Sequence, residues 1–211
     1  MEFIPLIISV LLIDFLSILT PGQDFAIVTR NTLRYSQSAG ITTAGGISVI
    51  TFFHALLAMT GLSALIAHSP DLMAGIRTIG AFYLIYLGGN FVKNAKNLEL
   101  ETSHKDKFKQ KFSHWKCFKM GAIANIFNIE PIMAFVSIFA ILLPTQTPLW
   151  VKLSICGLVT INTFLWMSFV SKIFSLSAVK HFAQHHFKKF EQIIGAVLLF
   201  LGFKTILTHK K

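Results

Sequence analysis

The sequence Leu-Thr-Pro-Gly-Gln-Asp, residues 19–24, ends an apolar run that begins at Phe3 and contains one charged residue, Asp14. Proline lacks a backbone donor and glycine tolerates unusual dihedral angles, so this segment interrupts a helix. Within lipid, each unpaired backbone group costs several kcal/mol unless protein or a water-filled cavity covers it. Residues 19–24 therefore mark either the surface end of a first helix or the wall of an internal site.

The composition is that of a helical membrane protein. The 211 residues are 54% hydrophobic and 13% charged, and the mean hydropathy of +0.65 is too high for an ordinary soluble domain. The pattern predicts an all-α polytopic protein, a single membrane domain with transmembrane helices each near the roughly 20 residues that a bilayer requires. We expect six such spans, at about 3–20, 39–67, 76–92, 120–143, 149–171 and 192–207.

The basic residues predict the orientation. Three loops that share one side of this topology hold Arg30 and Arg34, eight lysines in residues 93–119, and four lysines in residues 172–189, which is 14 of 19 basic residues. The positive-inside rule places these loops in the cytoplasm and both termini on the other side. The net charge of +10 then reflects topology, and no nucleic-acid partner is expected.

The two halves of the chain show a related organisation. A basic connector, residues 94–119, separates residues 1–93 from residues 120–211, and each half has three predicted spans. An odd number of spans per half makes the second half insert upside down, which is the inverted-repeat plan of many secondary transporters. The second half also contains an interruption, Asn-Ile-Phe-Asn-Ile-Glu-Pro at residues 125–131. Paired interruptions of this kind indicate a substrate site near the bilayer midplane, which favours the internal-site interpretation of residues 19–24.

These segments carry a family resemblance. The sequence LTPGQDFAIVTR, residues 19–30, resembles the first-helix signature of the LysE/RhtB family of amino-acid exporters, which typically reads Thr-Pro-Gly-Pro-Asp/Asn. Residues 80–88 resemble the third helix of that family and residues 121–144 its fourth, and the similarity covers nearly the whole chain. The resemblance implies a proton-driven exporter of amino acids or similar small metabolites in the bacterial inner membrane. In that membrane, the charge distribution described above places both termini in the periplasm.

The sequence departs from that family pattern at three positions, Gln23, Ile129 and Glu130. Gln23 stands where the family usually has its second proline, and the usual Asn-Pro-Lys of the fourth helix reads Asn128-Ile129-Glu130, followed by Pro131. Replacement of lysine by Glu130 reverses a charge at the expected site. Pro131 restores a helix-breaking residue two positions after the family proline.

Charged and polar residues inside the spans supply the candidate site. A carboxylate at the centre of a span costs about 2.5–3.5 kcal/mol and usually faces the bundle interior or a cavity. Each carboxylate also has a structural interpretation: Asp14 bonded to a neighbouring helix, Asp24 as a surface cap, and Glu130 at the interface. The predicted substrate and ion pathway comprises Asp14, Ser17, Thr20, Pro21, Gly22, Gln23, Asp24, Asn125, Asn128, Glu130 and Pro131.

Further polar residues are secondary candidates, with packing as the alternative. These are His54 and the pair Asn162 and Trp166, which are four residues apart and share a helix face. Small residues at positions 40, 44 and 48 suit close helix contact. Three histidines at positions 181, 185 and 186 have metal-like spacing, but no acidic or cysteine ligand is adjacent, so neither a metal nor a cofactor is expected.

Three functions are compatible with these features. The leading one is a secondary exporter, a non-enzymatic protein whose partners are a small-molecule substrate, protons and the lipid bilayer, with homo-oligomer formation left open. The first alternative is a metal-cation exporter using Asp14, Glu130 and histidines. The second is a membrane thiol oxidoreductase, although Cys117 and Cys156 lie on opposite sides in the predicted topology.

The topology gives a direct prediction. A reporter that is active only in the periplasm, fused after Lys211, should be active, because an even number of spans returns the C-terminus to the side of the N-terminus. A fusion within residues 94–119 should be inactive. Activity of a cytoplasmic reporter at the C-terminus would contradict the six-span topology.

Overall fold

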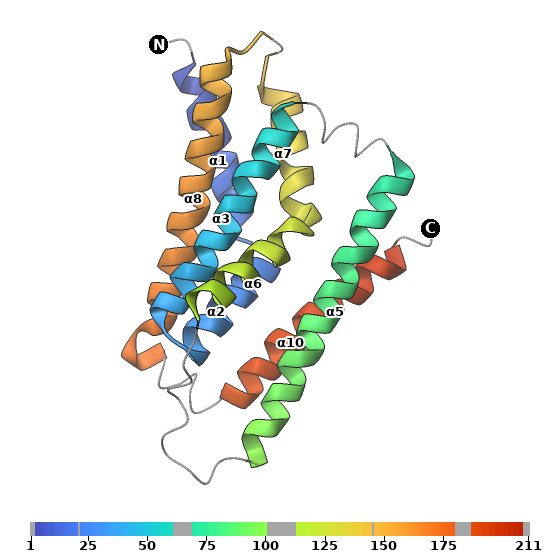
Figure 1. Cartoon of the computed structure of the whole chain (residues 1–211). Helices are drawn as coiled ribbons and strands as arrows, with labels where there is room; N and C mark the ends of the chain where they lie inside the picture. Colours follow the sequence, from blue (N-terminus) through green and yellow to red (C-terminus); the bar gives the residue numbers. More distant parts are fainter. Residues whose placement is uncertain are drawn as a thin grey trace.

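The computed structural model describes residues 3–20, 22–60, 69–100, 113–144, 146–179 and 187–208. Its regular elements, within those ranges, are all helices (Figure 1). They are α1 (Ile4–Ile18), α2 (Gln23–Arg34), α3 (Gln37–Met59), α5 (Pro70–Leu100), α6 (His114–Ile126), α7 (Ile129–Leu142), α8 (Leu149–Ser175) and α10 (Phe187–Thr208). The expectation of an all-α membrane protein is confirmed.

Two of the expected spans are broken at the predicted interruptions. The axes of α1 and α2 meet at 64°, and those of α6 and α7 meet at 56°. Helices α3 and α8 are each long and apolar enough to cross a membrane, and each broken pair has the length of one further span. Helices α5 and α10 cover the third and sixth predicted segments, so the count of six spans stays a prediction.

The second break has a clear local cause. Asn128 has extended backbone angles and its side-chain oxygen accepts a hydrogen bond from the backbone N–H of Glu130, which makes it the N-cap of α7. Pro131 then lies in the first turn of α7. Backbone N–H groups in a first turn have no partner within the helix, so the missing N–H of proline costs no hydrogen bond there. The break therefore lies before the proline, at residues 127–128, and Pro131 helps to start the second half of the span.

Helix α2 corrects the sequence interpretation. Residues 30 and 34 were expected in a loop, but they lie on a helix in which nine of 12 residues are buried. The Arg30 guanidinium is 3% exposed and lies 3.9 Å from the centre of the Phe91 ring. Arg30 is therefore an interior residue and does not count as a loop charge. The prediction failed because hydropathy reports contact with lipid, whereas α2 is polar and packs against protein.

The predicted connector, residues 94–119, is partly helical in the described residues, and its assignment as a cytoplasmic connector stays a prediction. Helix α5 continues to Leu100 and α6 begins at His114, so the ends of the predicted connector 94–119 are helical. Within α6, Cys117 is buried. The acidic residues at 101 and 106, like the histidines at 181, 185 and 186, lie outside the described residues.

Several contacts between the two halves follow a reciprocal pattern, although the contact of α2 with α10 has no comparable counterpart between α7 and α5 in the described part of the chain. If α1, α2, α3 and α5 are matched in order with α6, α7, α8 and α10, the contact of α1 with α8 corresponds to that of α6 with α3. The contact of α2 with α8 corresponds in the same way to that of α7 with α3, and α1–α7 corresponds to α2–α6. Helices α3 and α8 pack on each other, as do α5 and α10. This reciprocity supports the inverted repeat, which stays a prediction.

Small residues allow the closest helix contacts. A Cβ added to Gly88 of α5 would lie 2.7 Å from the carbonyl oxygen of Gly195 on α10, and one added to Gly46 of α3 would meet the backbone of Phe118 on α6. A Cβ added to Gly40 would likewise be too close to the side chains of Thr32 and Ser171. The expected small-residue stripe at 40, 44 and 48 is buried at all three positions, which confirms its packing role.

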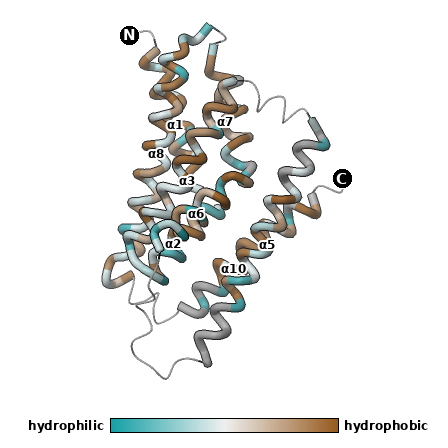
Figure 2. Tube along the Cα trace, in the orientation of Figure 1, coloured by the Kyte–Doolittle hydropathy of each residue, from teal (hydrophilic) through white to brown (hydrophobic). Residues whose placement is uncertain are grey.

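The outer surface suits lipid. Figure 2 shows hydrophobic residues along α1, α7 and α8, and more polar residues on α2. Figure 1 shows α5 and α10 side by side at one edge of the bundle, in contact with the rest through α2 and α6. Large apolar side chains face outward on several helices, among them Leu12, Leu16, Leu165, Phe169, Phe200 and Phe203.

The glycine contact can be tested with neighbouring residues of α5. Gly88→Ala should lower the stability of the purified protein by about 1–3 kcal/mol, because the added methyl group meets α10 backbone. Gly89→Ala is the matched control, since nothing lies within 4 Å of its added Cβ. It should be neutral or stabilise by up to about 1 kcal/mol through helix propensity. Equal melting temperatures in detergent for the two variants would contradict the close α5–α10 contact.

Candidate substrate site at the two helix breaks

The two interrupted helices meet through side-chain hydrogen bonds. The Asp24 Oδ2 atom, in the first turn of α2, accepts hydrogen bonds from Asn125 Nδ2 at 2.7 Å and from Asn128 Nδ2 at 3.4 Å. The neighbouring Gln23 Nε2 donates to the carbonyl oxygen of Ala124 at 2.8 Å. The start of α2 is thereby fastened to the end of α6. Pro21 lies outside the described residues, so its role in the pathway stays a prediction.

Each break places a helix N-terminus and an acidic residue at the same point. Asp24 lies in the first turn of α2 and Glu130 in the first turn of α7, where negative charge is favourable because unpaired backbone N–H groups are concentrated there. Asn128 serves both helices, because its oxygen caps α7 and its amide nitrogen reaches Asp24. A Cβ added to Gly22 would lie only 3.4 Å from Glu130 Oε2.

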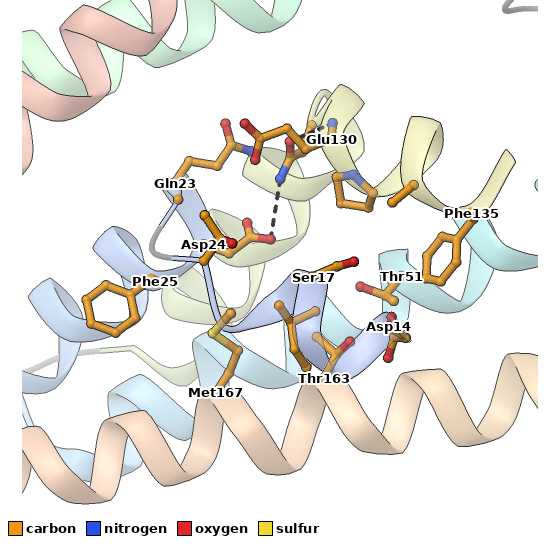
Figure 3. Close-up of a pocket in the computed structure, with 16 residues that line it drawn as sticks. Asp14, Ser17, Gln23, Asp24, Phe25, Thr51, Glu130, Phe135, Thr163 and Met167 are labelled. Carbon is orange, nitrogen blue, oxygen red and sulfur yellow. Dashed lines mark hydrogen bonds between the residues drawn. The ribbon is translucent and has the colours of Figure 1, made fainter. Parts of the chain in front are cut away.

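A cavity of about 370 Å³ opens beside this junction (Figure 3). Nine of the 11 predicted pathway residues line it; Asn125 contacts Asp24 from outside the lining, and Pro21 is not described. The wall consists of residues from α1, α2, α3, α7 and α8 and from the two breaks. It comprises Asp14, Ser17, Ile18, Thr20, Gly22, Gln23, Asp24, Phe25, Thr51, Asn128, Glu130, Pro131, Ala134, Phe135, Thr163 and Met167.

Asp14 combines both of its predicted environments. Its side chain is 3% exposed and accepts a hydrogen bond from Asn162 Nδ2 of α8 at 2.7 Å. It also lines the cavity, near Thr51 and Thr163 in Figure 3. The carboxylate is thus held by a neighbouring helix while it faces the interior space, and the two interpretations are not exclusive.

The secondary candidates lie outside the cavity wall. Asn162 holds Asp14, whereas Trp166 packs edge-on against Phe15 with ring centres 5.6 Å apart. His54 is 5% exposed and forms a hydrogen bond to the backbone of Ile126, the last residue of α6. These contacts join helices beside the cavity, so Asn162 and His54 position the site rather than line it.

Several lining residues were not identified from the sequence. Thr51 and Thr163 supply hydroxyl groups from α3 and α8, and Phe25, Phe135 and Met167 supply apolar surface. Threonine is a weak signal in a membrane helix, because its hydroxyl can bond to the backbone of its own helix, as Thr51 does to Ile47. Thr163 differs, because its buried hydroxyl has no hydrogen-bond partner among the described residues.

The cavity wall is acidic and otherwise neutral. It carries three carboxylates, from Asp14, Asp24 and Glu130, and the 16 lining residues include no lysine, arginine or histidine. Within the described ranges, no group of three or more histidine, cysteine or acidic side chains is arranged to hold a metal ion. Cys117 and Cys156 are both free and buried. The chemistry available at this site is recognition of positive charge, hydrogen bonding and proton exchange.

The structure combines apolar helices, two bent helix pairs and a polar cavity where the two breaks meet. This combination is typical of membrane transporters. A model of the LysE type translocator family matches residues 15–209. The chain therefore belongs to the LysE type translocator family, and the resemblance in the sequence is confirmed.

Relatives of this chain include both named exporters and proteins without a stated activity. An uncharacterized membrane protein of Bacillus subtilis, YrhP, is 31% identical over 194 residues, which cover 89% of this chain and 92% of the relative. An uncharacterized membrane protein of Haemophilus influenzae is 25% identical over 197 residues, covering 93% of this chain and 94% of the relative. The threonine efflux protein of Escherichia coli K12 is 24% identical over 198 residues, covering 94% and 95%. No solved structure gives a significant match.

The bond between Asp14 and Asn162 can be measured by a double-mutant cycle. Interhelical hydrogen bonds in membrane proteins contribute about 0.6 kcal/mol on average and up to about 1.7 kcal/mol. Asn162→Leu should lower the free energy of unfolding of the wild type, because it leaves a buried carboxylate without its donor. The same substitution should lower the free energy of unfolding less in an Asp14→Leu background. Unfolding in mixed micelles should give a coupling energy near 1 kcal/mol. Strictly additive effects would mean that the two side chains do not interact.

Proposed function

We propose that this protein is a secondary exporter that carries amino acids or similar small metabolites out of the cytoplasm across the bacterial inner membrane. The observation that carries this proposal is the cavity at the junction of the two broken spans, with three carboxylates on its wall. Membership of a translocator family and similarity to a threonine efflux protein support export as the direction of transport.

Alternating access is a natural consequence of this architecture. The first break belongs to the first half of the chain and the second break to the other half, and the Asp24–Asn125 and Asp24–Asn128 hydrogen bonds join them. Rocking of one half against the other would open the cavity to each side of the membrane in turn around a site that stays in place. Both hydrogen bonds use Asp24 Oδ2, so a substrate that binds Asp24 Oδ1 would contact the same carboxylate that joins the halves, which links occupancy of the site to the contact between them.

Proton coupling would use the carboxylates of the cavity. Protonation of Asp14 or Glu130 removes the negative charge that attracts an amine, so a proton and a positively charged substrate group exclude each other. A carboxylate that binds a proton on the periplasmic side and releases it to the cytoplasm would therefore drive substrate outward. Asp14 is the more enclosed of the two, because its side chain is buried and that of Glu130 is exposed to the opening.

The proposal is tested by transport in inverted membrane vesicles with an imposed pH gradient. Asp14→Asn and Glu130→Gln should each abolish gradient-driven uptake of the exported solute while the amount of protein in the membrane stays unchanged. Asp71→Asn is the matched control, because Asp71 is an exposed carboxylate at the start of α5, away from the cavity. Normal gradient-driven flux in both cavity variants would show that neither carboxylate couples.

A further inference from the structure

The donors in the cavity are poorly suited to a substrate carboxylate. A carboxylate inside a protein needs a cation or several N–H donors, and the lining residues supply no basic side chain. The side-chain nitrogens of Gln23 and Asn128 are directed to the Ala124 carbonyl and to Asp24. The hydroxyls of Ser17 and Thr51 donate to carbonyl groups of their own helices.

The helix N-termini at the breaks also carry acidic side chains. In broken-helix transporters these ends bind anionic substrate groups. Here Asp24 and Glu130 place the protein's own carboxylates in the first turns of α2 and α7. The backbone N–H of Glu130 already donates to Asn128. A substrate carboxylate would therefore meet negative charge at both helix ends.

In contrast, two buried oxygen atoms of lining residues have no hydrogen-bond partner among the described residues. Asp24 Oδ1 and Thr163 Oγ1 are buried, and neither atom has a hydrogen-bond partner in the part of the chain that the structure describes. Thr163 is 3% exposed and lines the cavity. Leaving such a group unpaired costs about 1–3 kcal/mol. An ammonium group carries three donors and no acceptor, so it matches Asp24 Oδ1 in both charge and hydrogen bonding, and the neutral Thr163 hydroxyl can accept one of its N–H groups.

The acidic groups lie at two separate ends. Figure 3 shows Asp14 beside Thr163 at one end, and Asp24 with Glu130 at the other. Apolar side chains, including those of Ile18, Phe135 and Met167, complete the wall. Such a surface suits a short methylene chain with a positive charge at each end, because the chain contacts apolar atoms while each charge meets a carboxylate.

We infer that the substrate is a short aliphatic diamine without a carboxylate, bound by Asp14 and Thr163 at one ammonium group and by Asp24 and Glu130 at the other. This inference rests on the proposed function, because it names the substrate class of the same transport site. It separates the substrate from α-amino acids, whose carboxylate would have no partner of opposite charge on the cavity wall.

The test is solute exchange in liposomes containing the purified full-length protein. 1,5-Diaminopentane and lysine are the probes, because lysine is the same diamine with one added carboxylate. Exchange of the diamine should exceed that of lysine at least tenfold at equal concentration. Lysine or threonine exchanged as fast as the diamine would overturn the inference and leave the proposed function standing. Exchange of none of the three by folded protein would overturn the inference, and the vesicle assay described above tests the proposed function separately.

Two variants with controls test the assignment of atoms. Thr163→Val removes the hydroxyl at constant volume. It should weaken diamine binding and so raise the half-saturating diamine concentration about tenfold. Thr160→Val on the same helix should leave it unchanged, because the Thr160 hydroxyl bonds to Cys156 and does not line the cavity. Glu130→Lys should lower diamine exchange and raise threonine exchange, whereas Asp71→Lys should alter neither. The proposed binding site would be contradicted if Thr163→Val and Thr160→Val changed diamine exchange equally, or if Glu130→Lys and Asp71→Lys did so.

Discussion

The structure depends on one interaction, the hydrogen bonds between the Asp24 carboxylate and the amides of Asn125 and Asn128. Each broken span ends in a region where unpaired backbone groups would be costly in lipid. The Asp24 contact brings the two breaks together, so each covers the other, and Asn128 caps α7 while it holds α2. Hydrogen bonds to a charged group contribute about 1.5–3 kcal/mol, which is enough to fix this junction.

The remaining packing places polar groups inside and apolar groups outside. Helix α2 could not face lipid with Arg30 and Asn31, and it is buried between the other helices instead. Arg30 lies over Phe91, and Asn31 donates to Thr43 at 2.9 Å, so the polar face of α2 is satisfied by protein. Glycine at the closest contacts lets α3 approach α6, and α5 approach α10. The cavity is the space that this arrangement leaves open at the junction.

Most of the cavity wall could be predicted because its residues are costly in an apolar span. Asp14, Asn128 and Glu130 interrupt runs in which only a function or a specific partner justifies them. Helix α2 could not be predicted, because its polar face resembles a loop when hydropathy is the only guide. The pairing of Asp14 with Asn162, 148 residues apart, requires the tertiary fold, and Thr163 gives no signal in sequence because most membrane threonines bond locally.

The proposed transport requires that the two breaks enclose a water-filled site that binds the exported solute. The direct measurement is alkylation by a charged, membrane-impermeant thiol reagent of a single cysteine at Thr51, in a protein whose native Cys117 and Cys156 are replaced by alanine. We expect labelling at Thr51, protection by the exported solute, and no labelling of a cysteine at Val49, which is exposed on the outer surface of the same helix. Absence of labelling at Thr51, or labelling that saturating solute does not slow, would contradict this requirement.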